Sequence, residues 1–169
     1  MMRPLRLWQR NLIGTVVIIV ALAVVITTDL VPKWSHYRST MAPAAVVPAR
    51  QSLTVEGQSW SIAEVRHLGQ RVKPLGTTLP AGTVVTAVTV RRDGPVTADP
   101  ACVGVLTDGH HRWRGQPLSR YNIKPAGDAP LSCAQPGPLQ WAFLIPEDVV
   151  PTAVDVTTLD GSIAIRLQL

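Results

Sequence analysis

The sequence predicts an all-β ectodomain, an antiparallel β-sandwich, preceded by one N-terminal transmembrane helix. Three observations predict this class: an uncharged apolar run near the N-terminus, alternating apolar and polar residues after residue 50, and turn-forming residues between the alternating segments. They divide the chain into a cytoplasmic N-terminus over 1–10, a transmembrane helix over 11–30, a proline-rich stalk over 31–51 and an extracytoplasmic sandwich over 52–169.

The apolar run covers residues 12–28, LIGTVVIIVALAVVITT, and holds no charged residue. A membrane-spanning helix needs about 20 mostly apolar residues, so a few flanking residues complete the span. Trp8 precedes the run, and Trp34 and Tyr37 follow it. Aromatic residues in these places are typical of the two interfaces of a bilayer.

The basic residues orient the predicted span. Arg3, Arg6 and Arg10 precede it, against Lys33 and Arg38 after it, which favours a cytoplasmic N-terminus and an exported C-terminal domain at the cell (inner) membrane. The formal charge is +5, and without the three N-terminal arginines 13 basic residues face 11 acidic ones. No basic stripe remains, so we expect no nucleic-acid partner.

A cleaved secretory signal is the alternative to a retained anchor. Its apolar core would span about 7–15 residues and end in a small-x-small cleavage site. The segment TTDLVPKW after the run offers no such site, and MAPAA at 41–45 lies well downstream. The sequence therefore favours a retained signal anchor.

The segment 31–51 carries Pro32, Pro43 and Pro48 without clear periodicity. It predicts a short, partly extended stalk. We expect the folded domain to begin near Ser52.

The alternating segments after the stalk predict strands. The clearest is SIAIRLQL at 162–169, where every second residue is Ile or Leu, and Asp160-Gly161 before it predicts a tight turn. No segment after residue 50 has helical spacing with caps. Further strands are predicted over 59–68, 83–92, 102–107, 139–146 and 152–159.

Cys102 and Cys133 are the only cysteines. An even number in an exported domain predicts a disulfide. It would close a loop of about 30 residues and stabilise the fold by about 3–4 kcal/mol.

The segment VLTDGHHRWRG, at 105–115, is the strongest candidate for chemistry. Asp108-Gly109 between two β-like runs predicts a two-residue hairpin, which places His110 and His111 on opposite faces of the return strand. Two such histidines do not readily bind one metal, so we expect a hairpin tip and no metal or cofactor. A metal site assembled by folding stays open as an alternative.

Other catalytic patterns are missing from the sequence, which holds no Gly-x-Ser-x-Gly and no glycine-rich phosphate loop. We expect no catalytic residues and no enzyme, with a hydrolase assembled only by folding as a further alternative. The tryptophans at 60, 113 and 141 suit a sandwich core or, as an alternative, a stacking platform for a ligand. The carboxylates are interpreted as solvated turn residues: Asp93, Asp99, Glu147, Asp148, Asp155 and Asp160.

The segment LPAGTVVTAVTVRRDG at 79–94 resembles the opening of a group of exported immunoglobulin-like domains of unknown function, found on actinobacterial membrane proteins and lipoproteins. Three later segments, 106–113, 136–146 and 152–159, follow in that family's order. The resemblance covers about 90 residues and rests on turn and strand residues. It implies an immunoglobulin-like sandwich without known catalytic residues.

These inferences lead to a functional hypothesis. We expect a non-enzymatic, single-pass membrane protein of the cell envelope, an accessory subunit that presents its domain to an envelope protein partner. A domain that binds a cell-wall glycan or lipid through exposed aromatic residues is the alternative.

Overall fold

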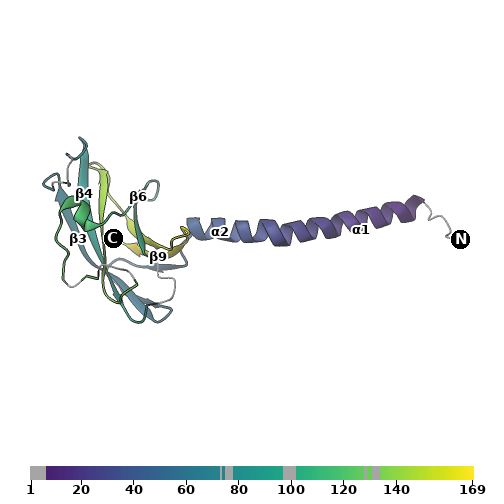
Figure 1. The fold of residues 1–169 in the computed structure, drawn as a ribbon, viewed down its shortest axis with the longest axis horizontal. Helices are drawn as coiled ribbons and strands as arrows, with labels where there is room; N and C mark the ends of the chain where they lie inside the picture. Colours follow the sequence, from purple (N-terminus) through teal and green to yellow (C-terminus); the bar gives the residue numbers. More distant parts are fainter. Residues whose placement is uncertain (1–6, 73, 75–77, 97–101, 128, 131–133) are drawn as a thin grey trace. The chain divides into compact units, whose positions relative to one another are not determined.

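The computed structural model describes residues 7–72, 74, 78–96, 102–127, 129–130 and 134–169, without the side chains of Leu7 and Arg10. The chain forms two compact units, Met1–Ser39 and Thr40–Leu169 (Figure 1). The first is helical and the second consists mostly of strands. The β-rich unit thus begins earlier than the predicted boundary near Ser52.

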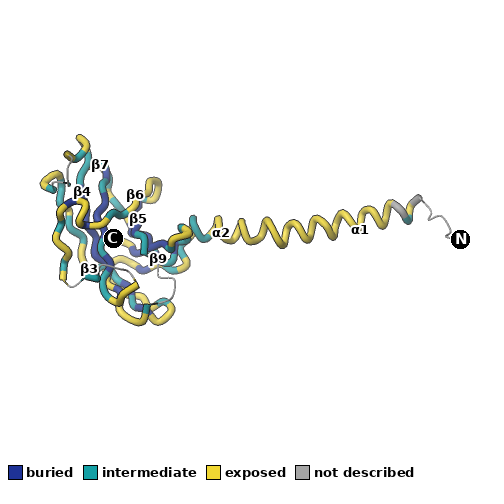
Figure 2. The backbone as a smooth tube through the Cα atoms, in the orientation of Figure 1, coloured by how far each residue is buried: buried dark blue, intermediate teal, exposed yellow. Residues whose placement is uncertain are grey.

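The N-terminal unit is built from helix. α1 (Leu7–Val25) is followed by a π-helical turn, η1 (Ile26–Leu30), and by α2 (Val31–Met41). The helical stretch Asn11–Met41 is long and apolar enough to cross a membrane by length and composition, and none of its apolar window is buried. Figure 2 shows this exposure along α1.

The partly extended stalk predicted over 31–51 differs from the structure in two places. Residues 31–41 are helical, and Ala45–Val47 form strand β1 of the sandwich. Pro32 does not end the helix, although it has no N–H to donate to the carbonyl of residue 28. The π-helical turn comes directly before it, where the N–H of Val31 donates to the carbonyl of Ile26, five residues back. Such turns absorb an interruption of the α-helical ladder.

Two sheets make up the C-terminal unit. Sheet A has the order β1-β9-β8-β5-β6 and sheet B the order β2-β3-β4-β7. β1 pairs parallel with β9, and the other pairs of neighbouring strands are antiparallel. The remaining strands are β2 (Leu53–Val55), β3 (Gln58–Gly69), β4 (Thr83–Asp93), β5 (Val103–Thr107), β6 (Arg112–Arg114), β7 (Leu139–Pro146), β8 (Ala153–Thr157) and β9 (Ile163–Gln168).

All six predicted strands are present, as β3, β4, β5, β7, β8 and β9. The alternation in β9 is also confirmed, because Ile163, Ile165 and Leu167 are buried and the residues between them are not. The structure therefore agrees with an all-β sandwich that follows a helix.

The main core is formed by buried side chains from both sheets, and Figure 2 shows buried segments in the strands of each sheet. Gly104 of β5 leaves room there for the indole of Trp141 on β7. A Cβ at position 104 would lie 2.5 Å from Cδ2 of that indole. Only a glycine allows this approach without moving the ring.

A second cluster covers the outer face of sheet B. A short 3₁₀ helix, η2 (Leu118–Tyr121), buries Leu118 and Tyr121 against Val85, Ala87 and Ala142. This cluster occupies one outer face of the sandwich with apolar side chains. The outer face of sheet A is different, and it forms the candidate site.

Candidate functional site

The Asp108-Gly109 segment is a hairpin tip, as predicted, but the connection is longer than two residues. β5 and β6 pair Thr107 with Arg112, so residues 108–111 form the loop. The hydroxyl of Thr107 donates to the carbonyl of His111 (2.8 Å) and accepts from the N–H of Gly109 (3.0 Å). Both histidines therefore lie in the loop, and their expected places on the return strand are wrong.

The carboxylate of Asp108 holds this loop together. Its Oδ1 accepts hydrogen bonds from the backbone N–H groups of His110 (2.8 Å) and His111 (2.6 Å), and its Oδ2 lies 3.0 Å from Nδ1 of His111. The bonds from His111 and His110 hold the pKa of the Asp108 carboxyl well below its usual range. This arrangement accounts for the motif as a local loop-stabilising device.

The outer face of sheet A carries charge. Alternate residues of its strands point into the core, including Leu106, Val154, Val156 and Ile165. The residues between them point outward. We call the outward-facing group formed by Arg112, Arg114, Asp155 and Arg166 the arginine face. Strand pairing aligns Arg114, Val105, Asp155 and Arg166 in one row across β6, β5, β8 and β9.

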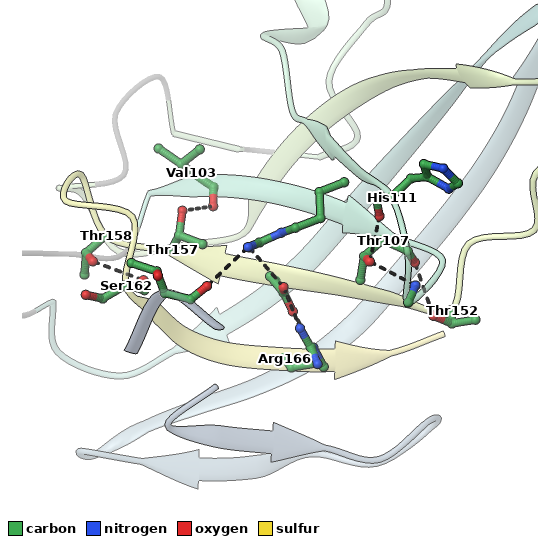
Figure 3. A network of polar contacts seen from close by, with 12 residues as sticks. Val103, Thr107, His111, Thr152, Thr157, Thr158, Ser162 and Arg166 are labelled. Carbon is green, nitrogen blue, oxygen red and sulfur yellow. Dashed lines mark hydrogen bonds and ion pairs between the residues drawn. The ribbon is translucent and has the colours of Figure 1, made fainter. Parts of the chain in front are cut away.

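Asp155 is the centre of the arginine face and is fully buried. Arg166 binds its carboxylate with two bonds, Nε to Oδ1 at 2.6 Å and Nη2 to Oδ2 at 2.9 Å. Arg112 donates from Nη2 to the same Oδ2 at 3.3 Å. Figure 3 shows Arg166 within this network and, farther along the sheet, the hydrogen bond from Thr157 to Val103. Two guanidinium groups share one carboxylate, so the cluster keeps a net positive charge.

The two arginines are not equivalent. The side chain of Arg166 is 31% exposed and that of Arg112 40% exposed. The two-bond contact with Asp155 raises the pKa of Arg166. Arg112 makes one bond to the carboxylate and another, from Nη1, to the carbonyl of Thr40 (3.2 Å). Arg166 is therefore the main counterion of the buried carboxylate.

The interpretation of Asp155 as a solvated turn residue is wrong. It lies in the middle of β8, flanked by Val154 and Val156. A signal was available in the sequence, because a lone acidic residue inside a β-branched run interrupts an otherwise apolar strand. A lone carboxylate at such a place is buried only when cations pair with it.

Two shallow grooves border the arginine face. One, of about 290 Å³, is lined by both Arg112 and Arg114, with Val103, Val105 and Thr157 among its other residues, and no acidic side chain is among its described lining residues. The second, of about 310 Å³, is lined by Arg114, Gly115 and Trp141 among others. Arg114 borders both grooves.

A larger hollow of about 510 Å³ lies where the end of β3 meets η2. His67 and Arg71 line it together with Tyr121, and Nδ1 of His67 lies 3.3 Å from Oγ1 of Thr86. His67 and Arg71 are exposed. The described residues that line this hollow form no charged network comparable with that of the arginine face.

Of the two interpretations of the tryptophans at 60, 113 and 141, the structure agrees with core positions and not with the alternative of a stacking platform. Trp60 and Trp141 are buried in the main core, and Trp113 is half-buried and packs against it. The indole N–H of Trp141 donates to the carbonyl of Cys102 (3.2 Å). These contacts are those of core tryptophans.

The remaining predicted residues are placed in part. Cys102 comes directly before β5, and Cys133 lies outside the described residues, so their disulfide stays a prediction. Trp34 and Tyr37 stack in α2 with ring centroids 5.7 Å apart. Trp8 is exposed on α1, which also contains Arg10, whereas Arg3 and Arg6 precede the described residues.

Among the residues that the structure describes, no three His, Cys, Asp or Glu side chains lie together as a metal site would require. The chain matches no family model, no curated protein and no solved structure. The arginine face and the apolar helix are therefore the two features of the chain that bear on its function.

Proposed function

We propose that the chain is a non-enzymatic, single-pass membrane protein of the cell envelope that presents an immunoglobulin-like domain to a protein partner outside the membrane. The observation that carries the proposal is the pairing of one exposed apolar helix with a separate β-rich unit. Exposed apolar side chains favour lipid over water, because burial of apolar surface is worth about 25 cal/mol per Å². The N-terminal arginines favour export of the β-rich unit.

The strand order supports the immunoglobulin-like assignment. In such sandwiches, strands B and E are neighbours in one sheet, and strands C, F and G are neighbours in the other. If β4, β5, β7, β8 and β9 are taken as B, C, E, F and G, the observed pairs β4/β7, β5/β8 and β8/β9 follow this plan. The chain departs from antibody domains because neither β4 nor β8 contains a cysteine.

The carboxylates of the candidate site already have hydrogen-bond partners within the protein, and this favours a binding function over a catalytic one. The carboxylate of Asp155 is held by two arginines, and that of Asp108 by a histidine and backbone N–H groups. An acid, base or nucleophile has to reach the substrate. A positively charged outer face on the β-rich unit, in a chain that also has an apolar helix, instead suits a subunit that recognises another protein.

The first test concerns the anchor. Full-length protein should stay with membranes after alkaline extraction, and an external protease should reach the sandwich in intact cells. Val20→Arg places a charge in the middle of the apolar run, where it costs about 2.5–3.5 kcal/mol, and should reduce membrane integration. Ser35→Arg, in α2 of the same helical stretch but outside that run, is the matched control. If alkaline extraction released the wild-type protein from the membranes, the proposal of a membrane anchor would be wrong.

The second test concerns the partner. Tagged full-length protein is purified in mild detergent, beside a variant that carries an unrelated transmembrane helix. A stoichiometric envelope protein recovered with both forms places the contact on the sandwich, and recovery only with the native helix places it in the membrane. Recovery of no partner with either form contradicts the accessory function.

A further inference from the structure

The edge of β6 that faces away from β5 carries no further strand among the described residues, and it has a definite backbone orientation. The N–H of Gly115, directly after β6, donates to the carbonyl of Gly104 at 2.7 Å. In an antiparallel pair, bonded and non-bonded residue pairs alternate along the strands. Trp113 therefore bonds to Leu106, its partner on β5, whereas the N–H and C=O groups of Arg112 and Arg114 point away from β5. Sheet A ends at β6 in the order of its described strands.

The side chains at this edge alternate in chemistry. Arg112 and Arg114 lie on the arginine face, and Trp113 between them lies on the opposite side, half-buried against the core. Arg114 is exposed and borders both grooves. Arg112 shares its carboxylate with Arg166, so it is only partly neutralised. The open edge thus offers backbone hydrogen bonds and positive charge from the same two residues.

We propose that this edge receives an extended segment of a partner protein, added antiparallel to β6, with an acidic–apolar–acidic sequence. Residues opposite Arg112 and Arg114 in a bonded register would have their side chains on the arginine face, where acidic groups face the guanidinium groups. The residue between them would lie beside Trp113. The inference rests on the proposed function and specifies the surface and partner chemistry.

A second copy of the chain does not fit as the occupant. Its sequence has 11 acidic residues, and no two of them stand two positions apart. An acidic pair on one face of a strand requires that spacing. The segment is therefore expected from a different protein.

The test uses full-length protein in mild detergent and a fluorescein-labelled, capped peptide with the sequence Thr-Glu-Val-Glu-Thr, followed by fluorescence anisotropy. The peptide is titrated to about 1 mM, because a short flexible segment loses affinity when it is ordered. Arg114→Gln should weaken binding about fivefold, the upper range for one cross-strand ion pair. The matched control is Arg91→Gln, an exposed arginine of β4 in sheet B, and it should leave binding unchanged.

A second peptide separates strand addition from simple charge attraction. Methylation of the backbone nitrogens of both glutamates removes the donors that would bond to the carbonyls of residues 112 and 114. We expect a loss of about tenfold or more, since each lost hydrogen bond costs about 0.5–1.5 kcal/mol. Equal binding of both peptides overturns the proposal, as does wild-type affinity in Arg114→Gln or failure of the unmethylated peptide to bind. Thermal unfolding of both variants verifies their fold.

The proposed function can fail separately. The wild-type protein and Arg114→Gln could co-purify with the same amount of a stoichiometric envelope partner. In that case the accessory function stands, and the edge of β6 is not the contact. If the wild type recovers no partner, the accessory function fails whatever the peptide does.

Discussion

Asp155 and Arg166 face each other across β8 and β9 and form two hydrogen bonds, of 2.6 and 2.9 Å. The carboxylate is fully buried, whereas about a third of the arginine side chain reaches solvent. The pair is therefore asymmetric: Arg166 can be rehydrated when its partner is lost, and Asp155 cannot.

This asymmetry predicts the stability of variants. Arg166→Met leaves a buried carboxylate with one weaker partner and should lower the free energy of unfolding by about 3 kcal/mol. Arg112→Met removes a longer contact from a more exposed side chain and should cost about 1 kcal/mol or less. Urea unfolding of the full-length protein, followed by tryptophan fluorescence, measures both. Equal losses would contradict the assignment of Arg166 as the main counterion.

The loop held by Asp108 predicts a pH dependence. The pKa of its carboxyl is lowered in the folded state, so its contribution to stability is present above the unfolded value near 4 and is lost as the pH falls through the lower folded value. At neutral pH, we expect the melting temperature of the wild-type protein to be higher than that of the Asp108→Ala variant. The difference should shrink as the pH falls below about 4. A difference that is constant down to the acid limit would mean that the ionised carboxylate does not hold the loop.

The contact between Gly104 and Trp141 predicts an overpacking effect. Gly104→Ala puts a methyl group against the indole and should cost about 1–3 kcal/mol. Trp141→Leu frees that space, so the double variant should lose less than the sum of the two single losses. Urea unfolding of the three variants gives the coupling. Simple additivity would show that the methyl group is accommodated elsewhere.

The cysteines predict resistance to alkylation. Iodoacetamide should not modify Cys102 or Cys133 in unfolded protein that was never exposed to a reductant, and mass spectrometry should recover their two peptides linked. The variant Cys133→Ser should lose about 3–4 kcal/mol of stability by the loop-entropy argument. Free alkylation of both thiols would refute the pairing.

The longer strands could be predicted because apolar and polar residues alternate over five or more positions, which is enough to recognise the pattern in the sequence. β1 and β2 have three residues each, too few for alternation to be recognised. They become strands because β1 pairs with β9 and β2 with β3, and a sequence does not display such long-range pairing. The length of α2 escaped prediction because Pro32 is normally read as a helix end.

The candidate site was predicted only in part. The hairpin between β5 and β6 was expected from Asp108-Gly109. Its four-residue loop, however, depends on hydrogen bonds that the side chains of Thr107 and Asp108 accept from backbone N–H groups. The arginine face was not expected. Its members come from β6, β8 and β9, and only the sheet order brings Arg112 and Arg166 to the same carboxylate.

The π-helical turn at Ile26–Leu30 has a consequence for any helix that packs beside this one. One extra residue in a turn rotates everything after it by about 100° relative to an uninterrupted α-helix. A stripe of side chains that begins on α1 is therefore displaced around the axis before it reaches α2. A neighbouring helix that packs along this stripe would therefore no longer contact it beyond Pro32. Deletion of one residue from the π-helical turn would align the two halves of the stripe again.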